Sequence, residues 1–177
     1  MAYFERISKY GPAEVSLPVR KTKLSAGYDI AAAEDCVIPS YFGLMEELKS
    51  TNPHTTVGLD GVAALTKQFG AKPTLVPTGI KCHLEDDEYL ELSVRSSTPL
   101  KYWIILANGV GIIDADYWNN DSNEGHIYFQ MINLSPFDIK INKGEILGQG
   151  IIKKYIKTDD DQADAERTGG FGSTSKQ

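Results

Sequence analysis

The stretch LELSVR at residues 90–95 places an apolar side chain at every second position. This alternation predicts a strand with one buried face, because successive side chains of a strand point to opposite sides of its sheet. The same period recurs at residues 127–131 and 137–142. Three such segments indicate a protein built mainly from sheets.

Further strand-like runs cover residues 74–84, 103–113 and 146–156. Between the runs stand clusters of Gly, Asn, Asp and Pro, which favour turns. These clusters are PTG (77–79), LEDDE (84–88), NDSNEG (120–125), LSPFD (134–138) and NKGE (142–145). Many short strands with frequent turns predict an all-β sandwich or barrel-like domain.

Residues 41–73 differ from the rest of the chain and predict a helical insertion. Asp60 is a candidate N-cap, and Val62, Leu65 and Phe69 follow it at helical spacing. No internal repeat of fixed period is present in the sequence.

Composition excludes several classes of protein. The 177 residues carry 24 acidic and 18 basic side chains, a net charge of −6, whereas a protein that follows a nucleic-acid duplex needs a basic surplus. Apolar runs such as 103–107 are far shorter than the ~20 residues of a membrane helix. The N-terminal MAYFERISKY lacks the apolar core of a signal peptide. We therefore expect a cytoplasmic protein without direct DNA or membrane binding.

The cysteines and histidines give no metal signature. Cys36 and Cys82 stand alone, and His54, His83 and His126 are scattered without the spacing of a zinc site.

Residues 108–117 (NGVGIIDADY) have two readings. The first is a β-hairpin whose aspartates cap a turn. The second is a glycine-rich hairpin whose backbone reads the edge of a flat ligand while a carboxylate holds a water for general-base attack. Asp114 and Asp116 are two residues apart, so on an extended strand both would point to one face.

Residues 94–101 (VRSSTPLK) are equally open in isolation. Arg95 with Ser96, Ser97 and Thr98 could form a phosphate cup, or the segment could be a surface loop after a strand. Asp29 and Gln149 carry no signal when taken alone.

The C-terminal segment is acidic and polar at 157–168 and then reads GGFGSTSKQ. Such a composition is usual for an unstructured terminus. The alternative is an arm that orders over a ligand, because glycines let backbone N–H groups approach phosphate oxygens.

The order of these segments resembles the five motifs of trimeric dUTP pyrophosphatases (dUTPases). The resemblance implies a β jelly roll over residues 1–156, containing the 41–73 insertion, and a homotrimer in which residues 157–177 close a neighbouring active site. Inserted segments of this kind occur in phage and some Gram-positive members of the family. The matching segments are AGYDI (26–30), VRSST (94–98), NGVGIIDADY (108–117), KGEILGQ (143–149) and RTGGFGST (167–174).

The resemblance also implies a reaction, in which dUTP and water give dUMP and pyrophosphate with Mg²⁺ on the triphosphate. Asp114 matches the aspartate that activates the water attacking the α-phosphorus, and Asp29 matches the one that reaches Mg²⁺ through water. Tyr117 matches the tyrosine under the deoxyribose. The other implied substrate-binding residues are Asn108, Gly109 and Ile113 for uracil, Arg95, Ser96, Ser97 and Gln149 for phosphate, and Arg167, Phe171, Gly172, Ser173 and Thr174 in the arm.

The sequence departs from the family pattern at several positions, and two alternatives stay open: a dCTP deaminase activity and a role in binding a partner protein. Ser97 stands where glycine is usual, and Trp118 follows the tyrosine where arginine is frequent. The related dCTP deaminases share part of the pattern. The 41–73 insertion is a candidate docking surface for a regulatory protein partner.

Overall fold

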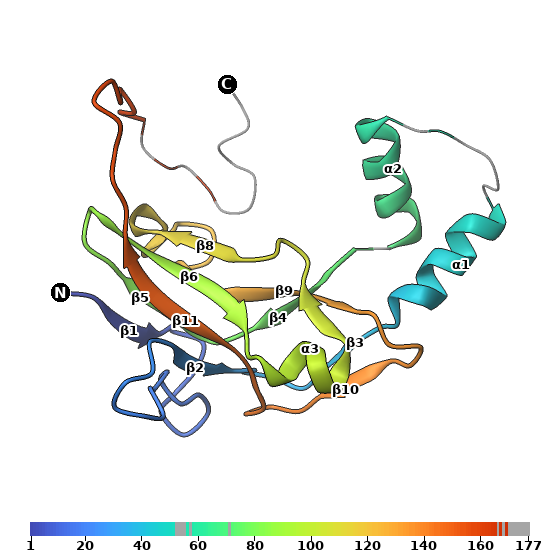
Figure 1. The fold of residues 1–177 in the computed structure, drawn as a ribbon, viewed down its shortest axis with the longest axis horizontal. Helices are drawn as coiled ribbons and strands as arrows, with labels where there is room; N and C mark the ends of the chain where they lie inside the picture. The colour runs from blue at the N-terminus through green and yellow to red at the C-terminus, as the bar shows by residue number, and fades with distance from the viewer. Residues whose placement is uncertain (52–55, 57, 71, 166, 168, 170–177) are drawn as a thin grey trace.

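The computed structural model describes residues 1–51, 56, 58–70, 72–165, 167 and 169 (Figure 1). Antiparallel sheets dominate it, as the sequence predicts, in a jelly-roll-like all-β architecture. One sheet has the order β2 (Tyr28–Ala31), β11 (Ile146–Lys154), β6 (Glu88–Val94), β8 (Gly111–Asp114). Another has the order β4 (Thr74–Pro77), β9 (Tyr128–Asn133), β7 (Ile104–Leu106). Two strand pairs complete the body: β1 (Tyr3–Arg6) with β5 (Ile80–His83), and β10 (Ile139–Ile141) with β3 (Cys36–Ile38).

The core lies between these sheets and confirms most of the predicted alternation. Leu90 and Leu92 of β6 are 0% and 1% exposed, and Phe129 of β9 is 0% exposed. The prediction is wrong at Phe137, which precedes β10 and is 74% exposed. The chain turns there because the Asn133 amide and the Ser135 hydroxyl both donate to the Phe137 carbonyl. A turn held by side chains therefore overrides the apolar pattern.

Two helices confirm the helical insertion: α1 (Tyr41–Thr51) and α2 (Leu59–Phe69). Figure 1 shows both helices projecting from the sheets, away from the end of β11. The proposed N-cap is wrong, because Gly58 precedes α2 and Asp60 lies inside its first turn. No helix among the described residues has the length and apolar character needed to cross a membrane.

A third helix, α3 (Ser97–Tyr102), was not predicted, because a six-residue helix is too short to show a hydrophobic period. Pro99 fits in its first turn, where backbone N–H groups need no helical partner. The helix ends at Trp103, whose φ of 57° lies in the left-handed region.

Candidate active site

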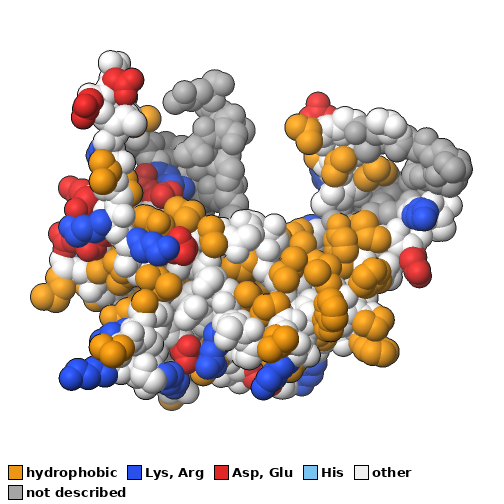
Figure 2. All heavy atoms as spheres, in the orientation of Figure 1, with side chains coloured by type: hydrophobic (Ala, Val, Ile, Leu, Met, Phe, Trp, Pro, Cys, Tyr) orange, Lys and Arg blue, Asp and Glu red, His pale blue; other side chains and the backbone are white. Residues whose placement is uncertain are grey.

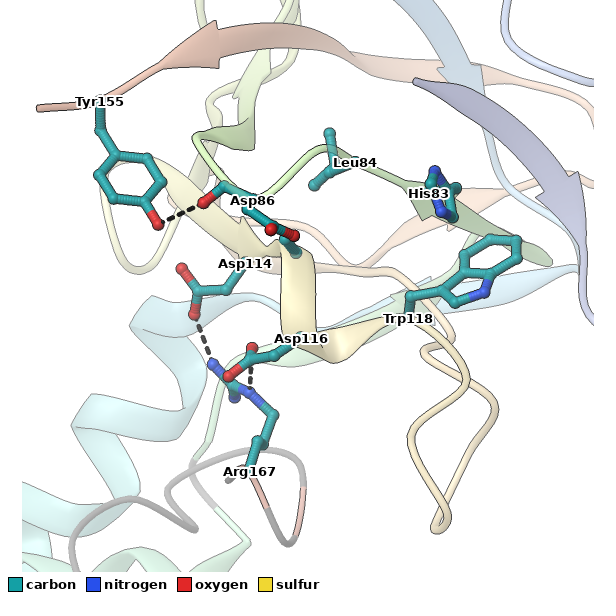
Figure 3. A pocket seen from close by; sticks show the side chains of 9 residues that line it. His83, Leu84, Asp86, Asp114, Asp116, Trp118, Tyr155 and Arg167 are labelled. Atoms are coloured by element: carbon teal, nitrogen blue, oxygen red, sulfur yellow. Dashed lines mark hydrogen bonds and ion pairs between the residues drawn. The ribbon is translucent and has the colours of Figure 1, made fainter. Parts of the chain in front are cut away.

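Strand β8 delivers Asp114 to the edge of an open cleft. The next residues form a short 3₁₀ turn, η1 (Ala115–Tyr117), which carries Asp116 to the same side. The cleft holds about 500 Å³. Its lining, shown in Figure 3, includes His83, Asp86, Asp114, Asp116, Trp118 and Tyr155.

Arg167 from the C-terminal segment closes one side of this cleft. Its Nη2 donates to Asp114 Oδ2 at 2.5 Å, and its Nε donates to Asp116 Oδ1 at 2.7 Å. The guanidinium carbon lies 5.8 Å from the centre of the Tyr117 ring. The two aspartates thus share a face, as predicted, although Asp116 reaches it from a 3₁₀ turn and not from an extended strand.

Tyr155 sets the start of the C-terminal segment beside the cleft. Its hydroxyl donates to the Asp86 carbonyl at 2.8 Å, and its N–H donates to the Asp87 carbonyl at 3.1 Å (Figure 3). These bonds continue the pairing of β11 with β6 past Lys154. The segment therefore leaves the sheet next to Asp114.

Trp118 lines the side of the cleft that lies opposite Tyr155 (Figure 3). Its ring stands edge-on to His83 at 5.4 Å and to Tyr3 at 5.5 Å. Lys81, which is only 8% exposed, places its Nζ 4.6 Å from the Trp118 ring centre. The tryptophan that departs from the family pattern is therefore packed as part of the wall.

The glycine-rich segment before Asp114 is not the predicted hairpin. Strand β7 pairs with β9, whereas β8 pairs with β6, so the two strands enter different sheets. Among the described residues, each strand ends its own sheet and has a free backbone edge. The turn between them contains Asn108 and Gly109. Gly109 has a φ of 72°, which lies in the left-handed region that glycine enters freely. Ile113 lies on β8 opposite Leu90.

A second group of predicted residues lies on the far side of β6. In the strand register Gln149 stands beside both Asp29 and Ser93, and its Nε2 donates to Ser93 Oγ at 3.3 Å. Arg95 Nε lies 3.6 Å from Asp29 Oδ1. A Cβ on Gly27 would stand 2.2 Å from Gln149 Oε1, so the glycine of the AGYDI motif leaves room for this side chain.

The structure separates these two groups. Asp114 is in register with Tyr89, near the beginning of β6, and Arg95 follows the end of that strand. Six residues of strand span about 20 Å. One chain therefore does not bring Asp114 together with Arg95, Asp29 and Gln149.

The remaining predicted residues are those that follow Arg95 and those of the C-terminal arm. Ser96 is exposed and Ser97 begins α3, but Thr98 does not belong to a phosphate cup, because it is 4% exposed and its hydroxyl donates to the Leu147 carbonyl. The predicted arm residues Phe171, Gly172, Ser173 and Thr174 lie outside the described residues.

Asn123 was not predicted as a site residue, although its Nδ2 donates to the Tyr117 hydroxyl at 2.7 Å. It lies in NDSNEG, a segment whose composition indicates a turn and says nothing of a contact with Tyr117. Tyr155 and Asp86 were not predicted either, because neither belongs to one of the motifs.

Comparison with known proteins gives concordant results. The family model "dUTPase" matches residues 47–175. A deoxyuridine 5'-triphosphate nucleotidohydrolase of Lactococcus lactis subsp. lactis (strain IL1403) is 38% identical over 174 residues, covering 97% of this chain and 95% of the relative. The crystal structure of dUTPase from Streptococcus mutans is 33% identical, with a TM-score of 0.68 over 88% of this chain and 98% of that one. The dUTPase from phage phi11 of S. aureus, whose structure visualises a species-specific insert, is 16% identical with a TM-score of 0.61 over 93% and 97%.

Proposed function

This chain belongs to the dUTPase family, and we propose that its two groups of site residues, acting together, convert dUTP and water to dUMP and pyrophosphate, with Asp114 activating the water. The family makes it a dUTP diphosphatase, a hydrolase. In the cell the reaction would limit uracil incorporation into DNA and supply dUMP for dTMP synthesis.

The observation that carries the proposed mechanism is the position of Asp114. Its carboxylate opens onto the cleft, with the side chain 52% exposed, and its described partner is Arg167. A triphosphate competes for that guanidinium, because phosphate oxygens form strong charge-assisted bonds with arginine. Once Arg167 turns to phosphate, the freed carboxylate can accept a proton from water.

Base selection would come from the free edges of β7 and β8. Uracil presents an acceptor, a donor and an acceptor along one edge, which backbone N–H and C=O groups can match. Cytosine presents a different order, and each buried group left unpaired costs ~1–3 kcal/mol. The Tyr117 ring, which is 7% exposed, would exclude a 2′-hydroxyl by contact with the sugar, and close packing at C5 would exclude thymine.

Asp29 is suited to hold Mg²⁺ through water. Its Oδ2 is buried without a hydrogen-bond partner among the described residues, and Mg²⁺ commonly keeps several of its waters. No group of three or more potential metal ligands occurs in the part of the chain that the structure describes. When bound with the triphosphate, Mg²⁺ would offset its negative charge.

A homotrimer would unite the two separated groups, with Asp114 from one copy and Arg95 from another. The surface beside Arg95 is apolar: on and after α3, Leu100 is 81%, Tyr102 53% and Trp103 64% exposed. Figure 2 shows hydrophobic side chains gathered around α3 and the base of α1. Apolar patches of this kind are typical of interfaces. In the proposed assembly residues 157–177 close over a neighbouring site once nucleotide binds.

The test is hydrolysis by the full chain with Mg²⁺ and dUTP, UTP, dTTP or dCTP in parallel. We expect pyrophosphate release from dUTP to be far faster than from UTP, dTTP or dCTP. Ammonia release from dCTP would instead identify a deaminase, and no pyrophosphate from dUTP above a no-enzyme blank would refute the proposal. A regulatory partner at 41–73 is a separate prediction, tested by comparing pull-downs with and without the insertion.

A further inference from the structure

The loop after Tyr117, residues 118–125, is tightly tied to the body of the protein. Glu124 accepts hydrogen bonds from both the N–H and the hydroxyl of Ser8, and Lys81 Nζ donates to Asn119 Oδ1 at 2.6 Å. A Cβ on Gly125 would stand 2.4 Å from the Tyr117 carbonyl oxygen, so the end of the loop lies directly on the tyrosine backbone. The loop is thus built against Tyr117.

Asn123 makes two bonds from this loop with opposite ends of its amide. Its Oδ1 accepts from the Gly125 N–H at 3.1 Å, which fixes the orientation of the amide and leaves Nδ2 as the donor to Tyr117. The Tyr117 hydroxyl accepts that bond at 2.7 Å and donates its own proton to the His126 carbonyl at 3.2 Å. The hydroxyl is therefore held from two directions.

We propose that Asn123 is a positioning residue for sugar selection, which rests on the role proposed for Tyr117. Steric exclusion of a 2′-hydroxyl works only if the ring cannot retreat when a ribonucleotide enters. The hydroxyl is the point of the side chain farthest from its backbone, so a bond there restrains the ring most effectively. Asn123 thereby turns an ordinary packed tyrosine into a fixed platform.

The variant Asn123→Ser separates this role from a role in loop folding. A serine hydroxyl can accept from the N–H two residues on, as asparagine does, but it is too short to reach Tyr117. We expect the ratio of kcat/KM for dUTP to that for UTP to fall about tenfold, because such a ratio measures how well the site rejects the wrong sugar. The ratio of the dissociation constants of UMP and dUMP, measured by calorimetry, should fall as well.

Two further variants make the result decisive. Tyr117→Phe keeps the ring but removes the hydroxyl, so it should lower the ratio similarly, and adding Asn123→Ser should lower it no further. Ser122→Ala is the control, because that hydroxyl bonds Asn120 and not Tyr117. If Asn123→Ser lowers kcat/KM for both nucleotides in parallel, or if the double variant is additive, the inference is wrong. Failure of the wild-type chain to hydrolyse dUTP would instead reject the proposed function itself.

Discussion

The two ends of strand β6 differ in chemistry. Near its beginning, in register with Asp114, the cleft presents the carboxylates of Asp114 and Asp116, and Arg167, which pairs with both, comes from a distant part of the chain. After its end stands Arg95, with Asp29 and Gln149 on the strands alongside. In the proposed mechanism one end activates water, and the other holds phosphate and a hydrated metal. A strand of this length keeps the two functions about 20 Å apart.

In the proposed mechanism this separation keeps the carboxylate of Asp114 away from Arg95 of the same chain, in a protein whose net charge is −6. If the carboxylate that activates water lay beside the phosphate cup of the same chain, the two would neutralise each other in the free protein. Arg95 and Asp29, at 3.6 Å, already show such a pairing at one end. Two copies that meet at their unlike ends would bring Asp114 of one copy and Arg95 of the other to a single site.

Substitutions of the two residues that distinguish the ends of β6 should reduce activity most. Asp114→Asn and Arg95→Ala should each reduce turnover, the former by about a thousandfold, as expected for loss of a general base. Asp114→Asn should still bind nucleotide, as measured by calorimetry with a non-hydrolysable dUTP analogue. Near-normal activity of Asp114→Asn would refute its assigned role.

Mixed assemblies of these two variants then test whether the ends cooperate between copies. Chains with different affinity tags are co-expressed and purified on both tags in sequence. In a trimer that carries both tags, one site in three should regain both residues, so activity should return to about a third of the wild-type value. If both ends served one site within a single chain, mixing would restore nothing. The control pairs Asp114→Asn with the double variant and should stay inactive.

Removal of the C-terminal segment, whose Arg167 contacts Asp114, should have a smaller effect. Truncation after Glu166 removes Arg167 and the glycine-rich residues, and should lower kcat/KM for dUTP by about a hundredfold through lost positioning of the nucleotide. The melting temperature should change little, because the described contacts of Arg167 lie on an exposed rim. A large fall in melting temperature would show that the segment supports the fold.

Beside Arg95, at the other end of β6, Asp29→Asn keeps the size of the side chain but removes its charge. We expect the apparent affinity for Mg²⁺ to weaken about tenfold, as for a residue that acts through metal-bound water. A titration of dUTP hydrolysis against Mg²⁺ measures this, with Asp35→Asn as the exposed control. Equal behaviour of the two variants would remove Asp29 from the metal site.

The smallest effect concerns the scaffold that both ends share. Burial lowers the pKa of His126 from 6.5 to about 4, and its Nε2 accepts from the Gly79 N–H at 2.9 Å. The folded protein therefore keeps this histidine neutral while the unfolded chain takes up a proton, so stability should fall as pH drops from 6.5 towards 4. The melting temperature should decrease by a few degrees, and His126→Gln should flatten that dependence. An unchanged slope in the variant would assign the loss to other groups.

Patterns among neighbouring residues predicted more of this structure than could be predicted for contacts between residues far apart in the sequence. Alternation located β6 and β9, and helical spacing located the insertion, because both depend on neighbouring residues. The separation of β7 from β8 could not be predicted, since partner choice is settled by packing between sheets. The resemblance named Asp114 and Arg95, but only the strand register shows how far apart they lie. Asn123 escaped notice because its contact with Tyr117 depends on how the loop turns back.

The free edges of β7 and β8 have an implication for how selectivity would withstand genetic change. Backbone atoms are the same whichever amino acid is encoded. A base recognised by backbone N–H and C=O groups would therefore be recognised almost independently of the side chains at these positions. Val110 and Ile112, which are 43% and 50% exposed, can then vary in a population with little risk of admitting the wrong pyrimidine. Mutations that bend this segment, and not those that alter its side chains, are the ones expected to erode fidelity.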